Sequence, residues 1–412
     1  MISLPHPTLR FADTRLRRRR SLVKLYAPHR LQLTYNARAA FFLLLRSLAA
    51  KERRTILLPA FHCTALVEPV TRTGFNAQFY RIQPDFRPDM DDVRRRMSAD
   101  VAAIVIIHYF GFPEELDPFL ELREEFGCSI VEDCAHSFLT ESEGLPLGHR
   151  GDFSLFSYYK FAPTLTGGGL GINGPHILDF PGAAKVSMRE HAVLAKRLFE
   201  QILENSPRNL LARLLLGLER RRVAQRQAQS EVVSHAAFVD DPYLFREDLA
   251  RAAMPGICRH VLESCDWESI VAARRNNYAL LSEAIQDRPV FRRVFPTLPA
   301  GVCPWAFPVI LENRLFHEQQ LRARGIPLFT FGEVLHPLLS RQNDLARTEA
   351  EYLSQRLLLL PVHIQIDAAK VKEIANRLVA YLDEVAGQAG DRAAGEVPQR
   401  VNLAAVSPGE SS

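Results

Sequence analysis

The sequence predicts an α/β protein, with a large domain built on a mostly parallel central sheet flanked by helices and a smaller α+β domain after it. Three observations predict this. From about residue 35 to 175, short apolar runs typical of buried strands alternate with stretches typical of helices. The 412 residues, 47% of them hydrophobic, suffice for more than one compact domain. After residue 300, further short apolar runs again alternate with helical stretches.

The elements of the large domain follow from composition and from the residues that end them. Asn36 is suited to cap a helix rich in Ala and Leu. Gly127 ends another helix. The β-branched run VAAIVII is typical of a strand inside a sheet that is covered on both faces. We expect helices over 36–50 and 117–126, and strands over 55–58, 101–107, 128–131 and 153–158.

The second half of the chain is predicted to be helical first and mixed later. Helical composition covers 183–235, including a leucine- and arginine-rich segment over 207–222 that begins after Ser206. We expect this segment to pack on a partner subunit or on the protein's own surface, with membrane-surface contact as the alternative. Further helix is predicted over 240–285, with breaks at Pro242, Pro255 and Gly256, and strands over 307–311, 325–331 and 357–362.

These patterns divide the chain into four parts. They are a basic N-terminal extension (1–30), a large domain (31–240), a small C-terminal domain (241–386) and a disordered tail (387–412) rich in Gly, Ala, Glu and Ser.

Charge and cysteine content exclude several classes of protein. The net charge of +4 is small for this length and gives no case for nucleic-acid binding. The arginine run from Arg15 to Arg20 is read as a solvated surface, with contact to an anionic partner as the alternative. No stretch reaches the ~18 apolar residues of a membrane span, and the N-terminus does not resemble a secretory signal. The six cysteines are scattered without zinc-site spacing, so we expect a reduced, cytoplasmic enzyme without a metal.

Ligands of such sheets bind beyond the carboxyl ends of the strands. The residues at those places are Phe61, His62, His108, Tyr109, Asp133 to His136, and Lys160.

Asp133 ends the buried strand in VEDCAHS. A carboxylate there is costly unless it has a partner. The protonated ring nitrogen of pyridoxal phosphate (PLP) is a partner of that kind, because the aspartate would hold in place the charge that makes PLP an electron sink. The alternative is a carboxylate that caps the following helix.

Lys160 lies just past another apolar strand and ahead of Gly167, Gly168 and Gly169. A lysine that forms a Schiff base must be desolvated so that its amine is neutral. The glycines would let the backbone approach a ligand closely. Most lone lysines lie on the surface, but the end of a buried strand is an unusual place for one. Gly169, Gly171 and Gly174 also spell GxGxxG; we reject dinucleotide binding because no capped helix and no suitably placed acid follow.

A phosphate group would suit the N-terminus of the first strong helix, where N–H groups are free and the dipole favours an anion. Asn36, Ala37 and Arg38 open that helix. An ordinary capped helix is the alternative.

Taken in order, these segments resemble the DegT/DnrJ/StrS family of PLP-dependent sugar aminotransferases, which have the fold of aspartate aminotransferase (fold type I). The likeness runs from about Leu31 to Asp383. It rests on LLPAFHCTALVEPV, HYFG, VEDCAHS and the GD…S…K…GG stretch, with RRNNY and LLLLPVHI in the smaller domain.

The resemblance implies roles for individual residues. Lys160 would be the Schiff-base lysine and Asp133 the partner of the pyridine nitrogen. His136 would reach the ring hydroxyl, Ser157 would bind the phosphate, and Ala37 and Arg38 would offer it backbone N–H groups. Since the usual stacking aromatic aligns near Cys63, His62 or Phe61 would cover the ring instead. The spacing from Ser157 to Lys160 is three residues where the family has five.

The resemblance also implies a reaction. The enzyme would transfer an amino group from glutamate to a keto-sugar, nucleotide-linked, for a surface polysaccharide or a secondary metabolite, and would work as a homodimer. Two alternatives remain. A PLP-dependent sugar dehydratase is one, although relatives of that kind lose the lysine that is present here. The other is a drifted member of the family that serves as a binding or scaffold partner.

Overall fold

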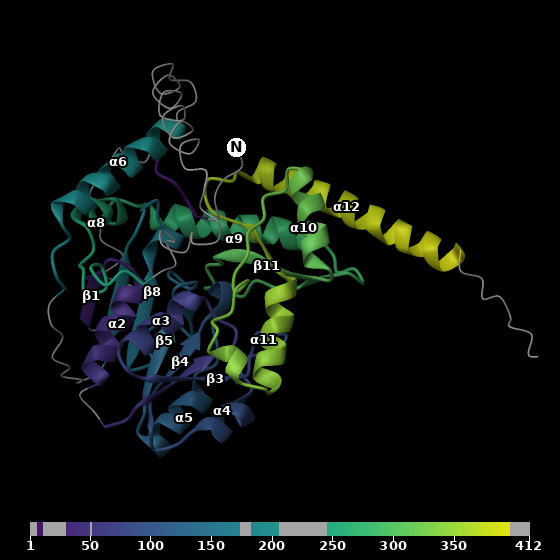
Figure 1. Ribbon diagram of the computed structural model, residues 1–412. Helices are drawn as coiled ribbons and strands as arrows, with labels where there is room; N and C mark the ends of the chain where they lie inside the picture. Colours follow the sequence, from purple (N-terminus) through teal and green to yellow (C-terminus); the bar gives the residue numbers. More distant parts are fainter. Residues whose placement is uncertain (1–5, 11–29, 50–51, 174–182, 206–244, 396–412) are drawn as a thin grey trace, which may run out of the picture.

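The structure is a computed structural model, which describes residues 6–10, 30–49, 52–173, 183–205 and 245–395 (Figure 1). The arginine run, the segment over 207–222 and residues 396–412 lie outside the described residues, so the predictions made for them stay predictions.

A seven-stranded sheet forms the centre of the large domain, in the order β1-β9-β8-β5-β4-β2-β3. The five strands from β8 to β3 are parallel, β9 pairs antiparallel with β8, and the edge strand β1 pairs antiparallel with β9. The predicted mostly parallel sheet is therefore confirmed. Its strands are β1 (Arg30–Thr34), β2 (Thr55–Pro59), β3 (Asn76–Tyr80), β4 (Val101–Ile107), β5 (Ser129–Asp133), β8 (Phe153–Ser157) and β9 (Gly168–Ile172).

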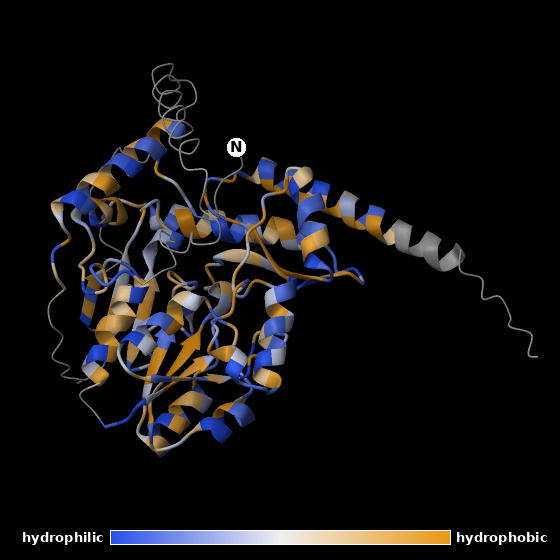
Figure 2. Ribbon diagram, viewed as in Figure 1, coloured by the Kyte–Doolittle hydropathy of each residue, from blue (hydrophilic) through white to orange (hydrophobic). Residues whose placement is uncertain are grey.

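Helices flank this sheet, and its strands are the most hydrophobic part of the fold (Figure 2). The apolar helix α2 packs against β8 and β9, and the side chain of Asn36 caps it by accepting a hydrogen bond from Ala39 N at 2.8 Å. Gly127 ends α5 in a left-handed conformation with φ 64°. The helices of this part are α2 (Ala37–Leu48), α3 (Thr64–Arg72), α4 (Met90–Arg96), α5 (Asp117–Phe126) and α6 (Met188–Glu204).

Three strands of the sheet were not predicted. β1 and β3 lie at its two edges, where the burial that makes strands recognisable is incomplete. β9 is built from the glycine run itself and pairs with β8 on one side and β1 on the other. Conversely, the strand predicted over 325–331 is absent; only a single bridge joins Phe329 to Leu359.

The smaller domain is a three-stranded antiparallel sheet with helices around it. Its strands are β10 (Phe291–Arg293), β11 (Ala306–Leu311) and β12 (Leu357–Pro361), and its helices are α9 (Trp267–Ala284), α10 (Arg314–Ala323), α11 (Leu345–Arg356) and α12 (Ala368–Gly395). The tail prediction was wrong in part, because α12 continues to Gly395 and residues 387–395 belong to it. No helix in the described ranges is long and apolar enough to cross a membrane.

The predicted domain boundary at residue 240 also differs from the structure. The backbone N–H of Tyr35 donates to Ala252 O at 2.8 Å, and Ala253 forms a bridge with Thr34 at the end of β1. Residues 252 and 253 therefore belong with the large sheet. Helix α8 (Gly256–Glu263) follows them before the chain enters α9.

Candidate active site

Lys160 and Asp133 lie at the same edge of the central sheet. Asp133 is the last residue of β5, and Lys160 ends a short 3-10 turn, η3 (Tyr158–Lys160), directly after β8. The two strands are parallel neighbours, with Asp133 opposite Leu155. Because their carboxyl ends meet at this edge, two residues that are 27 positions apart in the sequence are brought together.

The two groups influence each other electrostatically. Burial lowers the pKa of the Lys160 amine, and the neighbouring Asp133 carboxylate opposes that change. Burial likewise raises the pKa of Asp133, which the Lys160 charge opposes. The amine is thereby shifted toward its neutral, nucleophilic form. One carboxylate oxygen of Asp133, Oδ1, accepts a hydrogen bond from Ala135 N at 2.9 Å.

The other acid of the pair, Glu132, is fully used by the fold. It is buried, receives a hydrogen bond from His108 Nε2 at 3.0 Å, and accepts the backbone N–H groups of Gly148, Arg150 and Gly151. These bonds lower the pKa of Glu132 against the opposing effect of burial. With Cys134, these two side chains form the one cluster in the described residues with metal-ligand spacing. Since its nitrogen and oxygen atoms are already paired, we assign it a structural role.

His136 lies in an aromatic stack beside the lysine. Its ring is 4.0 Å from the ring of Trp305 and nearly parallel to it, and the ring of Phe331 meets its edge at 4.5 Å. The Lys160 ammonium nitrogen is 4.7 Å from the Trp305 ring centre. Burial, and to a lesser degree the Lys160 charge, keep the pKa of His136 well below its usual value, so the ring is neutral.

Trp305 was missed by the sequence reasoning. It directly precedes β11 in the small domain, far from the motifs of the large domain. The available signal was its rarity, as the chain has two tryptophans, together with its place just before a buried strand.

Arg274 ties this tryptophan to the lysine. The guanidinium is fully buried in α9 and donates to the carbonyls of Lys160 at 2.8 Å, Trp305 at 3.0 Å and Pro304 at 3.1 Å. These acceptors are backbone oxygens rather than carboxylates. Burial lowers the pKa of Arg274 to about 10, and the residue therefore adds positive charge to the lysine side of the site. It is the first residue of the RRNNY motif.

Ser157 and the N-terminus of α2 come together through Gly168. In the β8–β9 pair, Ser157 lies opposite Gly168. The Cα of Gly168 in turn lies against the backbone of Asn36 and Ala37, which leaves no space for a side chain there. The close contacts found at these glycines are to the protein, Gly167 to Met254, Gly168 to α2 and Gly169 to Tyr158. The expectation that their backbone approaches a ligand stays a prediction. Arg38 follows in the first turn of α2.

Phe61 and His62 are buried, and their rings pack against other aromatic rings. The His62 ring stacks on Phe79 of β3 at 5.1 Å, and its Nδ1 is paired with Pro59 O at 3.0 Å. Phe61 meets Phe331 edge to face at 5.6 Å. The ring-covering role given to these two residues stays a prediction. Cys63, at the position where the family has its stacking aromatic, acts electrostatically on Lys160. The aromatic ring that the Lys160 amine contacts is Trp305.

Comparison with known proteins shows what the chain is similar to. The model of the DegT/DnrJ/EryC1/StrS aminotransferase family matches residues 25–172, which contain Lys160, Asp133 and the N-terminus of α2. The matched part, 148 of the 412 residues, is similar to this family. A curated relative, dTDP-4-dehydro-2,3,6-trideoxy-D-glucose 4-aminotransferase of Saccharopolyspora spinosa, is 23% identical over 357 residues, 85% of this chain and 83% of its own. Six further curated relatives are matched over 33–44% of their length.

Solved structures share the fold of this chain. An aminotransferase from Streptoalloteichus hindustanus superposes with a TM-score of 0.67 at 19% identity, covering 94% of this chain and all of the other. A sugar aminotransferase from Streptococcus pneumoniae in its PLP form gives a TM-score of 0.62 at 16% identity, covering 88% and 90%. The predicted fold type I architecture is confirmed.

Proposed function

We propose that the protein is a PLP-dependent aminotransferase that transfers an amino group from glutamate to a nucleotide-linked keto-sugar in polysaccharide or secondary-metabolite biosynthesis. The observation that carries the proposal is the Lys160–Asp133 pair at the carboxyl edge of the sheet, with its amine shifted toward the neutral form. The match to the family model and the sugar-nucleotide substrate in the name of the Saccharopolyspora relative support the substrate class.

The residues of the site fit PLP. The Asp133 carboxylate lies at the carboxyl end of β5, and its charge suits a protonated ring nitrogen. The buried His136 Nδ1 has no hydrogen-bond partner among the described residues. Ser157 and the first N–H groups of α2 suit a phosphate. When bound, PLP supplies an electron sink that permits exchange of an amino group between two carbonyl compounds.

Each residue then has a specific task. Lys160 would hold the cofactor covalently, and its free neutral amine would later take up and return a proton at Nζ. Asp133 would keep the ring nitrogen protonated. Arg274 positions Lys160 through its carbonyl, while Trp305 and His136 would exclude water from the amine.

The first test is spectroscopic. Purified protein mixed with PLP is expected to show the absorbance band of lysine-bound PLP near the visible edge. Lys160→Ala should abolish the band, while Lys196→Ala, which removes an exposed helix lysine paired with Glu200, should leave it unchanged. Identical spectra for the wild type and Lys160→Ala would overturn the assignment of Lys160.

The second test concerns the reaction. Glutamate should shift the band of the wild-type protein toward that of the aminated cofactor, and a nucleotide-linked keto-sugar should reverse the shift. A band that glutamate and other amino donors leave unchanged would contradict transamination and favour the dehydratase or the binding protein.

We further propose that the protein is a homodimer and acts in the cytoplasm, as expected for this family. Light scattering coupled to size-exclusion chromatography should give about twice the chain mass of 46.6 kDa. A mass of one chain at micromolar concentration would contradict the dimer.

A further inference from the structure

A short N-terminal segment (residues 6–10) is held between the two domains. Thr8 exchanges hydrogen bonds with the side chain of Gln365, which lies between β12 and α12; its N–H donates to Gln365 Oε1 at 3.0 Å. On the other side, Leu9 N donates to Gln201 Oε1 of α6 at 3.2 Å, and Asn205 Nδ2 donates to Leu9 O at 3.0 Å. The segment is therefore attached to both the large and the small domain.

Leu9 anchors the same segment through apolar contacts. Its side chain is 4% exposed and packs in a small cluster with Leu198 of α6 and Val261 of α8. This cluster is separate from the main core, so the segment has its own apolar contact site on the large domain.

These anchors place His6 at the lysine. Its ring meets Tyr159, the neighbour of Lys160, edge to face at 5.0 Å. It also stacks on Trp305 at 6.0 Å with an interplanar angle of 20°. The tryptophan thus has His136 at 4.0 Å and His6 at 6.0 Å, both nearly parallel to it, in addition to the Lys160 nitrogen at 4.7 Å.

Burial, assisted by nearby positive charges, keeps His6 neutral. Burial, together with the charges of Lys160, Arg274 and His363, lowers its pKa to about 3. A neutral ring adds apolar cover without adding positive charge beside the amine. At Lys160, burial lowers the pKa of the amine, and the charge of Asp133 opposes that effect.

We propose that His6 is a positioning residue of the active site, whose ring covers the Trp305 side and keeps water away from the Lys160 amine. The inference rests on the proposed function in so far as Lys160 is the reactive amine. It does not depend on which amino donor or sugar is used. The large and small domains would both be needed to complete this cover, because the 6–10 segment is bound to each of them.

The test measures the Lys160 amine directly. The full-length protein, freed of PLP, is labelled with trace acetic anhydride at a series of pH values, and acetylation of Lys160 is quantified by peptide mass spectrometry. In His6→Ala the midpoint of labelling should move to higher pH, with about a tenfold smaller neutral fraction at neutral pH, the change made by one unit of pKa. His6→Phe should keep the wild-type midpoint, because it preserves an uncharged ring.

Two further variants complete the design. Leu9→Ala, which loosens the anchor while keeping His6, should shift the midpoint in the same direction as His6→Ala. His260→Ala, at an exposed position of α8, should leave it unchanged. An unmoved midpoint in both His6→Ala and Leu9→Ala would overturn the proposal, as would a shift in His6→Phe equal to that in His6→Ala. The assay contains neither cofactor nor substrate, so a failure of transamination would not affect its result.

Discussion

At the scale of single residues, burial and the charge of Asp133 act in opposite directions on the pKa of Lys160, and burial has the larger effect. The carboxylate raises the pKa of the amine, while burial lowers it. The same carboxylate is the partner proposed for the pyridine nitrogen. The Asp133 side chain therefore affects both the pKa of Lys160 and, as proposed, the charge of the cofactor ring. A single substitution changes the two in ways that can be measured separately.

Asp133→Asn is expected to lower the pKa of the Lys160 amine further, because the favourable charge is lost and burial remains. The labelling midpoint of Lys160 should move to lower pH, opposite in direction to His6→Ala. Transamination should nevertheless fall by about 100-fold or more, as expected when a fixed charge that stabilises the reaction is removed. Asp248→Asn, an exposed partner of Arg246, is the matched control. If the labelling midpoint of Lys160 in Asp133→Asn moved to higher pH or did not move, the electrostatic coupling between Asp133 and Lys160 would be contradicted.

His62 makes folding sensitive to acid. Burial lowers its pKa from 6.5 to about 4. Its unfolded form therefore binds more protons between these values, and stability is lost as the pH falls from 6.5 toward 4. At pH 5 the loss from this residue should be roughly 2 kcal/mol relative to pH 7. Urea unfolding at both pH values should show His62→Phe losing less stability than the wild type, and an equal loss would refute the assignment.

At the scale of elements, β9 shows why glycine is required at one position of the sheet. Any side chain on Gly168 would collide with the backbone of Asn36 and Ala37 at the start of α2. This contact brings the capped helix next to the end of β8. Gly168 thus allows α2 to pack closely on β9, and this packing positions the proposed phosphate site.

Gly168→Ala should destabilise the protein by about 1–3 kcal/mol, the usual range for overpacking. It should also weaken PLP binding, because α2 must move. Gly256→Ala is the matched control, since a side chain at that position meets nothing within 4 Å. Thermal unfolding and PLP titration would check both effects. Equal behaviour of the two variants would show that α2 and β9 can separate without cost.

Elements with a strong local signal were predictable from the sequence. β4 and α5 have the predicted bounds because a long β-branched run and a helix ended by glycine are determined locally. β9 was missed because glycine disfavours strands, and tertiary packing around Gly168 overrides that preference.

The residues of the site likewise fall into those that could be predicted from the sequence and those that could not. Lys160 and Asp133 could be located because strand ends converge in any parallel sheet. Trp305 and His6 could not, because they reach the lysine from the small domain and from the N-terminal segment through contacts that no local pattern encodes.

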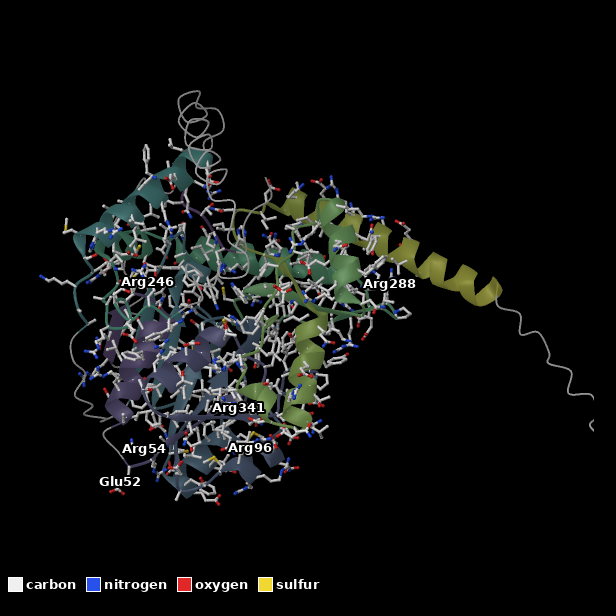
Figure 3. All side chains as sticks on the ribbon, viewed as in Figure 1. Glu52, Arg54, Arg96, Arg246, Arg288 and Arg341 are labelled. Carbon is white, nitrogen blue, oxygen red and sulfur yellow. The ribbon has the colours of Figure 1, made fainter. Side chains whose placement is uncertain are left out.

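At the scale of the whole molecule, ion pairs join the large domain to α11. Arg81, just after β3, makes a two-pronged contact with Glu349 at 2.6 and 2.7 Å. Arg96 of α4 bonds Asp344, the residue that caps α11, at 2.5 Å. Figure 3 labels Arg96 close to Arg341, where these parts meet. The contacts hold the small domain at a set position over the sheet edge.

Glu349→Gln should lower the free energy of unfolding by about 1 kcal/mol at low salt, above the median for exposed pairs because both partners are largely buried. High salt should reduce the difference between the variant and the wild type. Glu351→Gln, which breaks a more exposed pair with Arg347, should change stability by less than about 0.5 kcal/mol. Chemical denaturation at two salt concentrations would measure these differences in the free energy of unfolding. If Glu349→Gln lost the same amount of stability at both salt concentrations, an ionic contact would be contradicted.

The position of the 6–10 segment has a practical consequence for making the protein. A purification tag at the N-terminus would be joined ahead of His6, whose ring contacts Tyr159 and Trp305 beside Lys160, and a polyhistidine tag would add histidines to the segment that binds there. A tag attached beyond α12, which projects away from the body of the protein in Figure 1, avoids that interference. Activity compared between the two fusions should be read with this difference in mind.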